Sequence, residues 1–143
     1  MSFNSALYHY LSSNAAIASL VGTRIYPQRA ESGAARPYIT YAKIGNDHVH
    51  HQGGAAGLTS AMRQLDVWAD SALSAESVYD ALRTALDGMS GTMGTGAYET
   101  TVESILIVDD DEGFEKPTDG SQQATYRHRV DITIWHRETV PTF

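Results

Sequence analysis

The stretch "TYRHRVDITIWHRE" alternates apolar and polar side chains with a period of two. Val130, Ile132 and Ile134 fall on one side of an extended chain, and charged or bulkier polar residues fall on the other. This is the period of a β-strand that buries one face. Such a strand needs a sheet covered by an apolar layer on one side, so the pattern limits the possible folds more than any other feature.

Three further stretches have strand character. In "TSAMRQLDVWAD" the residues Leu65, Val67 and Ala69 alternate with polar or aromatic neighbours, and "RPYITYAKIGN" alternates in a similar way. These two stretches are expected to form an antiparallel hairpin. The stretch "ETTVESILIVDD" is predicted to join the final strand through an acidic turn, "DDDEGFEKPTDGS". The short "TRIYPQ" contains Pro27, which indicates a brief strand or an extended arm.

Helical spacing occurs twice. Phe3, Leu7 and Leu11 recur at the period of an N-terminal helix that could break near Ser13. In "SAESVYDALRTALDGM" the apolar residues form one stripe, with Ser74 as the expected N-cap and a glycine at the C-terminal end. The following "GTMGTGAY" is interpreted as a flexible connector.

The order of these segments predicts an α+β fold with one domain over residues 1–143. We expect an antiparallel sheet with a mixed edge, two α-helices packed on one face, and long projecting hairpin loops.

Composition excludes several classes of protein. The chain has 143 residues, of which 42% are hydrophobic, and this is enough for a single core. Its formal charge of -7 and its ten basic residues argue against a protein that wraps nucleic acid. There is no cysteine, no signal-peptide pattern and no apolar run of membrane-spanning length, so we expect a cytosolic protein with no membrane association.

The stretch "DHVHHQGGAAG" places His48, His50 and His51 within four positions. Histidine-rich tracts often bind metals, so one hypothesis is a small metal-dependent enzyme that uses His48, His50 and a carboxylate. No HExxH-like spacing supports this, and the glycines around the tract favour a solvated loop between two strands. The loop is the preferred interpretation.

Other chemical motifs are absent from the sequence. The run Asp109, Asp110, Asp111 and Glu112 does not have the register of an EF-hand, and it is interpreted as a solvated hairpin tip. There is no G-x-S-x-G elbow, and "GTMGTG" is neither a dinucleotide fingerprint nor a phosphate loop. No catalytic, metal-binding or cofactor-binding residue is therefore assigned, and no cofactor is expected.

In its order of segments the chain resembles the tail-completion, or tail-terminator, proteins of long-tailed phages, prophages and gene-transfer particles. The resemblance lies in "ALYHYLSSNAAIASLVGTRIYPQ", "ARPYITYAKIG", "GLTSAMRQLDVWAD", "SAESVYDALRTALDGM" and "TYRHRVDITIWH". It covers nearly the whole chain, although each motif alone is weak because similar strands and helices occur in unrelated proteins. The histidine tract is not an expected feature of the family.

The resemblance implies a structural virion protein with no enzymatic activity. Such a subunit forms a ring, usually hexameric, which caps the tail tube, stops its polymerisation and offers a joining surface to the head. Its implied partners are further copies of itself, the tail tube protein and the head-completion or connector protein, and DNA passes through the ring without specific binding. Its implied location is the head-proximal end of the virion tail, after assembly in the cytoplasm of the bacterial host.

Two sets of side chains are candidates for interfaces on this hypothesis. The stretch from His48 to Gly57 and the acidic turn are expected to project toward neighbouring subunits, the tube or the channel, and four arginines are expected to form ion pairs between subunits. The candidate interface residues are Arg24, Arg63, Arg127, Arg129, His48, His50, His51, Asp109, Asp110 and Asp111. A stand-alone protein-binding or ligand-binding domain of a cellular complex remains a further alternative.

Overall fold

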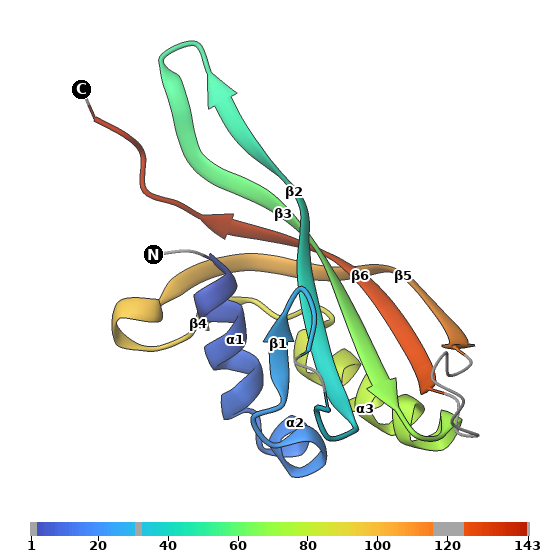
Figure 1. Cartoon of the computed structure of the whole chain (residues 1–143). Helices are drawn as coiled ribbons and strands as arrows, with labels where there is room; N and C mark the ends of the chain where they lie inside the picture. Colours follow the sequence, from blue (N-terminus) through green and yellow to red (C-terminus); the bar gives the residue numbers. More distant parts are fainter. Residues whose placement is uncertain (1–2, 31–32, 116–124, 143) are drawn as a thin grey trace.

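The fold is an α+β arrangement of one mixed sheet and three α-helices, seen in a computed structural model that describes residues 3–30, 33–115 and 125–142 (Figure 1). The elements in chain order are α1 (Phe3–Ser13), α2 (Ala15–Val21), β1 (Ile25–Pro27), β2 (Tyr38–His51), β3 (Gly54–Ala69), α3 (Ala72–Leu86), β4 (Gly91–Met93), a short 3-10 turn η1 (Gly96–Tyr98), β5 (Thr100–Glu115) and β6 (Thr125–Arg137). The six strands lie in the order β1-β2-β3-β6-β5-β4.

Strand β6 lies in the interior of the sheet, between β3 and β5, and is antiparallel to both. Its alternation is confirmed, because Val130, Ile132 and Ile134 are at most 1% exposed. They share one core with Leu65 of β3 and with apolar residues of all three helices. The predicted β2–β3 hairpin is also confirmed, and the parallel strand β1 gives the sheet its mixed edge.

The helical segments differ from the prediction in number and in one cap. The N-terminal helix is two helices, because the Asn14 side chain accepts a hydrogen bond from the Ile17 amide and starts α2. The structure therefore has three α-helices rather than two. Helix α3 is capped by Ser71, whose hydroxyl accepts from the Ser74 amide at 3.1 Å, so the prediction of Ser74 as the N-cap is wrong.

The histidine tract lies in strand rather than in a loop. Strands β2 and β3 stay paired out to His51 opposite Gly54, and only Gln52 and Gly53 form the turn. The predicted loop from His48 to Gly57 is therefore wrong in its extent, because cross-strand pairing resumes at His50–Ala55 and His51–Gly54 beyond an irregularity after His48. Strand β6 pairs with β3 only as far as Leu58, so the end of the hairpin projects beyond the sheet (Figure 1).

The acidic run is also strand rather than turn. Strand β5 continues to Glu115, and its register puts Asp109 opposite Asp131 and Asp111 opposite Arg129. The predicted solvated tip at Asp109–Glu112 is wrong, because pairing with the basic strand β6 offsets the local repulsion between the acids. The rest of the predicted turn, residues 116–121, lies outside the described residues. The expected flexible connector at residues 91–98 is instead β4 followed by the 3-10 turn.

Candidate functional site

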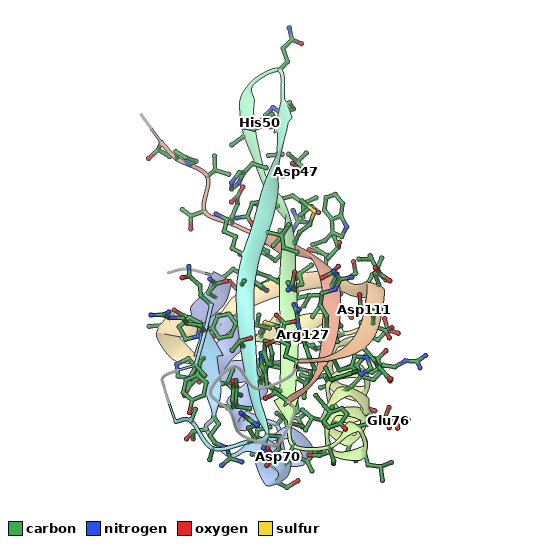
Figure 2. The ribbon with its side chains drawn as sticks, turned by 45° about the vertical axis from the view of Figure 1, so that its right-hand side comes forward. Asp47, His50, Asp70, Glu76, Asp111 and Arg127 are labelled. Carbon is green, nitrogen blue, oxygen red and sulfur yellow. The ribbon has the colours of Figure 1, made fainter. Side chains whose placement is uncertain are left out.

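Polar side chains gather at two separate places on the sheet. One group surrounds a cavity at the base of the projecting hairpin, and the other lies where β5 ends and β6 begins. Figure 2 shows the projecting hairpin, with Asp47 and His50, apart from the part of the sheet that holds Asp111 and Arg127. We call these groups the hairpin-base cavity and the acidic end.

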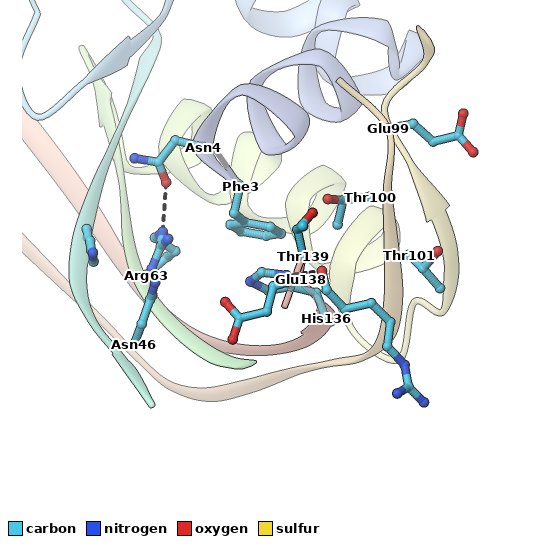
Figure 3. Close-up of a pocket in the computed structure, with 12 residues that line it drawn as sticks. Phe3, Asn4, Asn46, Arg63, Glu99, Thr100, Thr101, His136, Glu138 and Thr139 are labelled. Carbon is cyan, nitrogen blue, oxygen red and sulfur yellow. Dashed lines mark hydrogen bonds between the residues drawn. The ribbon is translucent and has the colours of Figure 1, made fainter. Parts of the chain in front are cut away.

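The hairpin-base cavity has a volume of about 630 Å³ and is open to solvent (Figure 3). It lies between the start of α1, the inner part of the hairpin, the start of β5 and the segment that follows β6. Its lining includes Phe3, Asn4, Arg63, Glu99, His136 and Glu138.

Arg63 projects from β3 toward this cavity and is only 2% exposed. Its guanidinium donates to the Asn4 side-chain oxygen at 2.8 Å and to the Asn46 side-chain oxygen at 2.9 Å, and it lies 5.2 Å from the centre of the Phe3 ring. No described carboxylate lies within ion-pair distance of it. Burial lowers the pKa of Arg63 from its usual value, because the charged form loses its hydration.

His136 lies beside Arg63 at the floor of the same cavity. It is 6% exposed and stacks on Phe3 with ring centres 4.6 Å apart. Its Nδ1 lies 3.0 Å from the Arg137 carbonyl, so this nitrogen carries the proton, and its buried Nε2 has no hydrogen-bond partner among the described residues. Burial lowers the pKa of His136, and its backbone hydrogen bond only partly opposes this.

A third contact fixes the hairpin to the segment after β6. The His48 Nδ1 lies 2.7 Å from a Glu138 carboxylate oxygen, and the Glu138 amide donates to the Gly57 carbonyl at 2.9 Å. Burial alone would raise the pKa of Glu138, but hydrogen bonds from Thr59 and His48 outweigh it and hold the pKa below its usual value. His48 therefore has a partner within its own chain.

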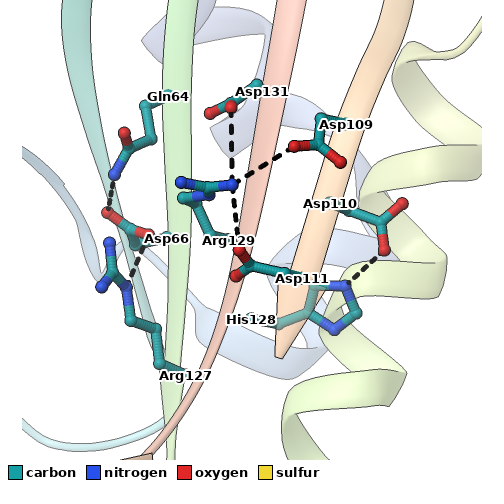
Figure 4. Close-up of polar contacts among 9 residues, drawn as sticks. All are labelled: Gln64, Asp66, Asp109, Asp110, Asp111, Arg127, His128, Arg129 and Asp131. Carbon is teal, nitrogen blue, oxygen red and sulfur yellow. Dashed lines mark hydrogen bonds and ion pairs between the residues drawn. The ribbon is translucent and has the colours of Figure 1, made fainter. Parts of the chain in front are cut away.

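The acidic end pairs arginines of β6 with carboxylates of β3 and β5 (Figure 4). Arg127 donates to Asp66 at 2.9 Å, and this hydrogen bond raises the pKa of Arg127 despite its partial burial. Arg129 contacts three carboxylates on the same side of the sheet. Its Nη2 lies 3.3 Å from Asp109, 2.9 Å from Asp111 and 3.8 Å from Asp131.

The opposite side of the same strands holds a buried histidine. His128 is 3% exposed and stacks on Tyr79 of α3 with ring centres 4.0 Å apart. Its Nε2 lies 3.3 Å from Asp110, which also accepts a hydrogen bond from the Tyr79 hydroxyl. Its Nδ1 lies 3.8 Å from Glu112, at ion-pair distance only. Carboxylates thus lie on both sides of β5 at this end.

The remaining candidate interface residues lie outside both groups. Arg24 donates to the backbone carbonyls of Pro37 and Leu20, which fixes the start of β1. His51 accepts from the Gly53 amide at 3.0 Å and supports the turn, and His50 is exposed near the tip. Among the described residues there is no group of three or more His, Asp or Glu side chains that could hold a metal ion.

Several residues of these groups were not identified from the sequence, among them His136, Glu138, Asn4 and Tyr79. Each acts through a contact that is distant in sequence, such as the 59 residues between Asn4 and Arg63. Only His136 carried a local signal, since it continues the buried side of the β6 alternation beyond Ile134.

No helix in the described parts of the chain has the length and apolar character needed to cross a bilayer.

Comparison with known proteins agrees with this fold. A solved chain from the structure described as "Virion of native gene transfer agent (GTA) particle" superposes with a TM-score of 0.60 at 19% sequence identity, over 93% of this chain and 91% of that chain. No curated protein matches the sequence. The family model described as "Tail completion protein gp17" matches residues 5–137. The chain therefore belongs to the tail completion protein gp17 family and is a structural component of the virion tail.

Proposed function

We propose that this protein is a tail terminator: a ring of subunits, six in number, that caps the tail tube, stops its polymerisation and provides the surface that joins the head. The observation that carries the proposal is the family match over residues 5–137, which leaves little of the chain for a different activity. The solved chain from a gene transfer agent virion supports it, because its fold spans nearly the same length.

The shape of the subunit suits contacts with several neighbours. In the proposed assembly the helices cover one face of the sheet, and the other face, the projecting hairpin and the sheet edges are available to partners. Strand β1 pairs with β2 only from Ile39 to Tyr41, so the outer edge of β2 beyond that point has no strand partner among the described residues. Long unpaired edges are uncommon in isolated domains and are often covered in assemblies.

The proposed partners are further copies, the tail tube protein and the head-completion or connector protein. DNA passes through the proposed ring without specific binding. The charge of -7 supports this role, because a channel for DNA should not attract phosphate strongly. In this proposal the ring occupies the head-proximal end of the tail and assembles in the host cytoplasm.

Deletion of the gene tests the proposal. We expect particles with over-long tails and few joined heads, because tube growth has no stop, and we expect complementation by the wild-type gene to restore both. Electron microscopy of purified protein mixed with tail tubes should show rings at tube ends. Normal tail length in the deletion strain would overturn the proposed function.

A further inference from the structure

The positive charge of Arg63 has no counter-ion among the residues that the structure describes. Arg63 is 2% exposed, and its hydrogen-bond partners among the described residues are the side-chain oxygens of two asparagines and two backbone carbonyls. A buried charge without an opposite charge destabilises a fold unless something else compensates it. The neutral hydrogen bonds and the Phe3 ring provide part of this compensation.

The cavity beside Arg63 has room and chemistry for one further anionic group. Its volume of about 630 Å³ exceeds that of a carboxylate. The buried His136 Nε2 has no hydrogen-bond partner among the described residues, and it can donate to a bound carboxylate only when both ring nitrogens are protonated. Besides Arg63, the cavity is lined by two cations, Lys43 and Arg137, and by two carboxylates, Glu99 and Glu138. The lining therefore has an excess of one positive charge, which matches a single carboxylate better than a doubly charged phosphate. These features favour a side-chain carboxylate as the ligand.

The acidic end has the complementary excess of charge. Six carboxylates lie near the guanidinium groups of Arg127 and Arg129 and the His128 ring: Asp66, Asp109, Asp110, Asp111, Glu112 and Asp131. The side chains of Asp109, Asp111 and Glu112 remain 63%, 59% and 70% exposed. Thr101 of β5 lines the cavity, and Asp109 follows eight residues later, so the two groups lie about 25 Å apart. Arg63 and the carboxylates of the acidic end therefore cannot form an ion pair within one subunit.

We propose that the hairpin-base cavity is a binding site for a carboxylate of the Asp109–Glu112 segment of a neighbouring copy. This inference rests on the proposed ring. Two different, complementary surfaces on one subunit make a head-to-tail contact, which closes into a ring when the rotation between subunits is suitable. Arg63 supplies the charge and His136 lies beside the bound group.

A peptide of residues 107–115, "IVDDDEGFE", tests the site without the ring. We expect it to shift the Arg63 Nε–H and His136 ring resonances in NMR spectra with a saturable titration curve. The response should be lost in Arg63→Met and retained in Arg83→Met, a matched change at a side chain that is 65% exposed. A peptide with Asn and Gln in place of its acids should bind at least about tenfold more weakly.

Three results of the peptide titration would overturn the inference. They are no saturable shift for the acidic peptide, the same shift in Arg63→Met, and tighter binding of inorganic phosphate than of the peptide. The last result would assign the cavity to a phosphate-bearing ligand instead.

Assembly of mixed variants tests the head-to-tail geometry. One variant is Arg63→Met, and the other combines Asp109→Asn, Asp111→Asn and Glu112→Gln. Each alone should associate at least roughly 30-fold more weakly than the wild type, because one partner of a desolvated pair is missing at every contact. In a mixture, the acidic segment of the Arg63→Met variant can still bind the intact cavity of the other variant, but the reverse contact is lost. Sedimentation should therefore show heterodimers and no rings.

The outcome also separates this inference from the proposed function. If both variants form rings as the wild type does, the carboxylate site is wrong and the terminator role stands. If wild-type protein forms no ring even at tube ends, the proposed function fails. Circular dichroism of each variant checks that its fold is retained.

Discussion

The two ends of the sheet place an arginine in opposite environments. At the acidic end Arg129 lies within 4 Å of three carboxylates, and its side chain is 29% exposed. Arg63 at the hairpin base is 2% exposed, and among the described residues its guanidinium contacts neutral oxygens and an aromatic ring but no carboxylate. An arginine among carboxylates offsets their mutual repulsion, but an isolated buried arginine mainly loses hydration. The first arrangement stabilises the subunit, and the second is useful chiefly when a partner supplies an acid.

The core that both ends share should give the largest effect. Ile134 is fully buried on β6, opposite Ala61 of β3 and Ile105 of β5, so it connects the two parts of the sheet. We expect Ile134→Ala to lower the free energy of unfolding by about 3 kcal/mol in urea titrations. The matched change Ile44→Ala, at a hairpin side chain that is 55% exposed, should alter it by less than about 0.5 kcal/mol. Equal losses of unfolding free energy in the two variants would contradict the conclusion that Ile134 belongs to a core shared by both ends of the sheet.

Replacing the two arginines tests the comparison directly. Arg129→Met should lower the free energy of unfolding by about 1–2 kcal/mol, because Asp109, Asp111 and Asp131 then repel one another, and roughly 0.5 M salt should restore part of it. Arg63→Met should leave the stability of the isolated subunit within about 0.5 kcal/mol of the wild type or raise it. Both values come from urea titration followed by tryptophan fluorescence. A larger loss for Arg63→Met than for Arg129→Met would reverse the comparison.

A smaller effect should appear in the pH dependence of the hairpin base. The pKa of His136 is lowered in the folded state, so below the unfolded value of about 6.5 the unfolded chain binds more protons. Above pH ~6.5 the neutral His136 ring costs the fold nothing. As the pH falls from there toward the folded pKa, the free energy of unfolding decreases by at most about 1.4 kcal/mol per pH unit. His136→Asn keeps a donor for the Arg137 carbonyl and should remove this decline. If the difference in free energy of unfolding between wild type and His136→Asn stays constant from pH 8 to pH 5, the predicted role of His136 is contradicted.

Sequence patterns predicted the parts of the fold that depend on local periodicity. The alternation of Val130, Ile132 and Ile134 identified the buried side of β6, and the helical stripe through Leu82 and Leu86 identified α3. The acidic run was misread because its local charge and neighbouring turn residues favour a loop. Its strand conformation depends on pairing with Arg129 and its neighbours on β6, which lie some twenty residues away.

The candidate site was less predictable for a related reason. Arg63 was proposed for an ion pair between subunits, but nothing local to "AMRQL" indicates that its side chain would be buried against Asn4 and Phe3. The histidine tract attracted attention through composition. Within the described parts of the chain, its one polar contact beyond the hairpin is that of His48 with Glu138, 90 residues away. Charges that meet only in the folded sheet leave no periodic pattern in the sequence.

The position of β6 has a consequence for the timing of synthesis. This strand follows all the others in sequence but lies between β3 and β5, so the β2–β3 hairpin and the β4–β5 pair have no strand between them until it is added. It also carries Arg127 and Arg129 of the acidic end and His136 of the cavity. A nascent chain that has not released β6 from the ribosome therefore lacks His136 of the cavity and the arginines that face the carboxylates of β5. The cavity is therefore complete only after the last strand of the sheet has been made, whereas the acidic segment of β5 is made earlier.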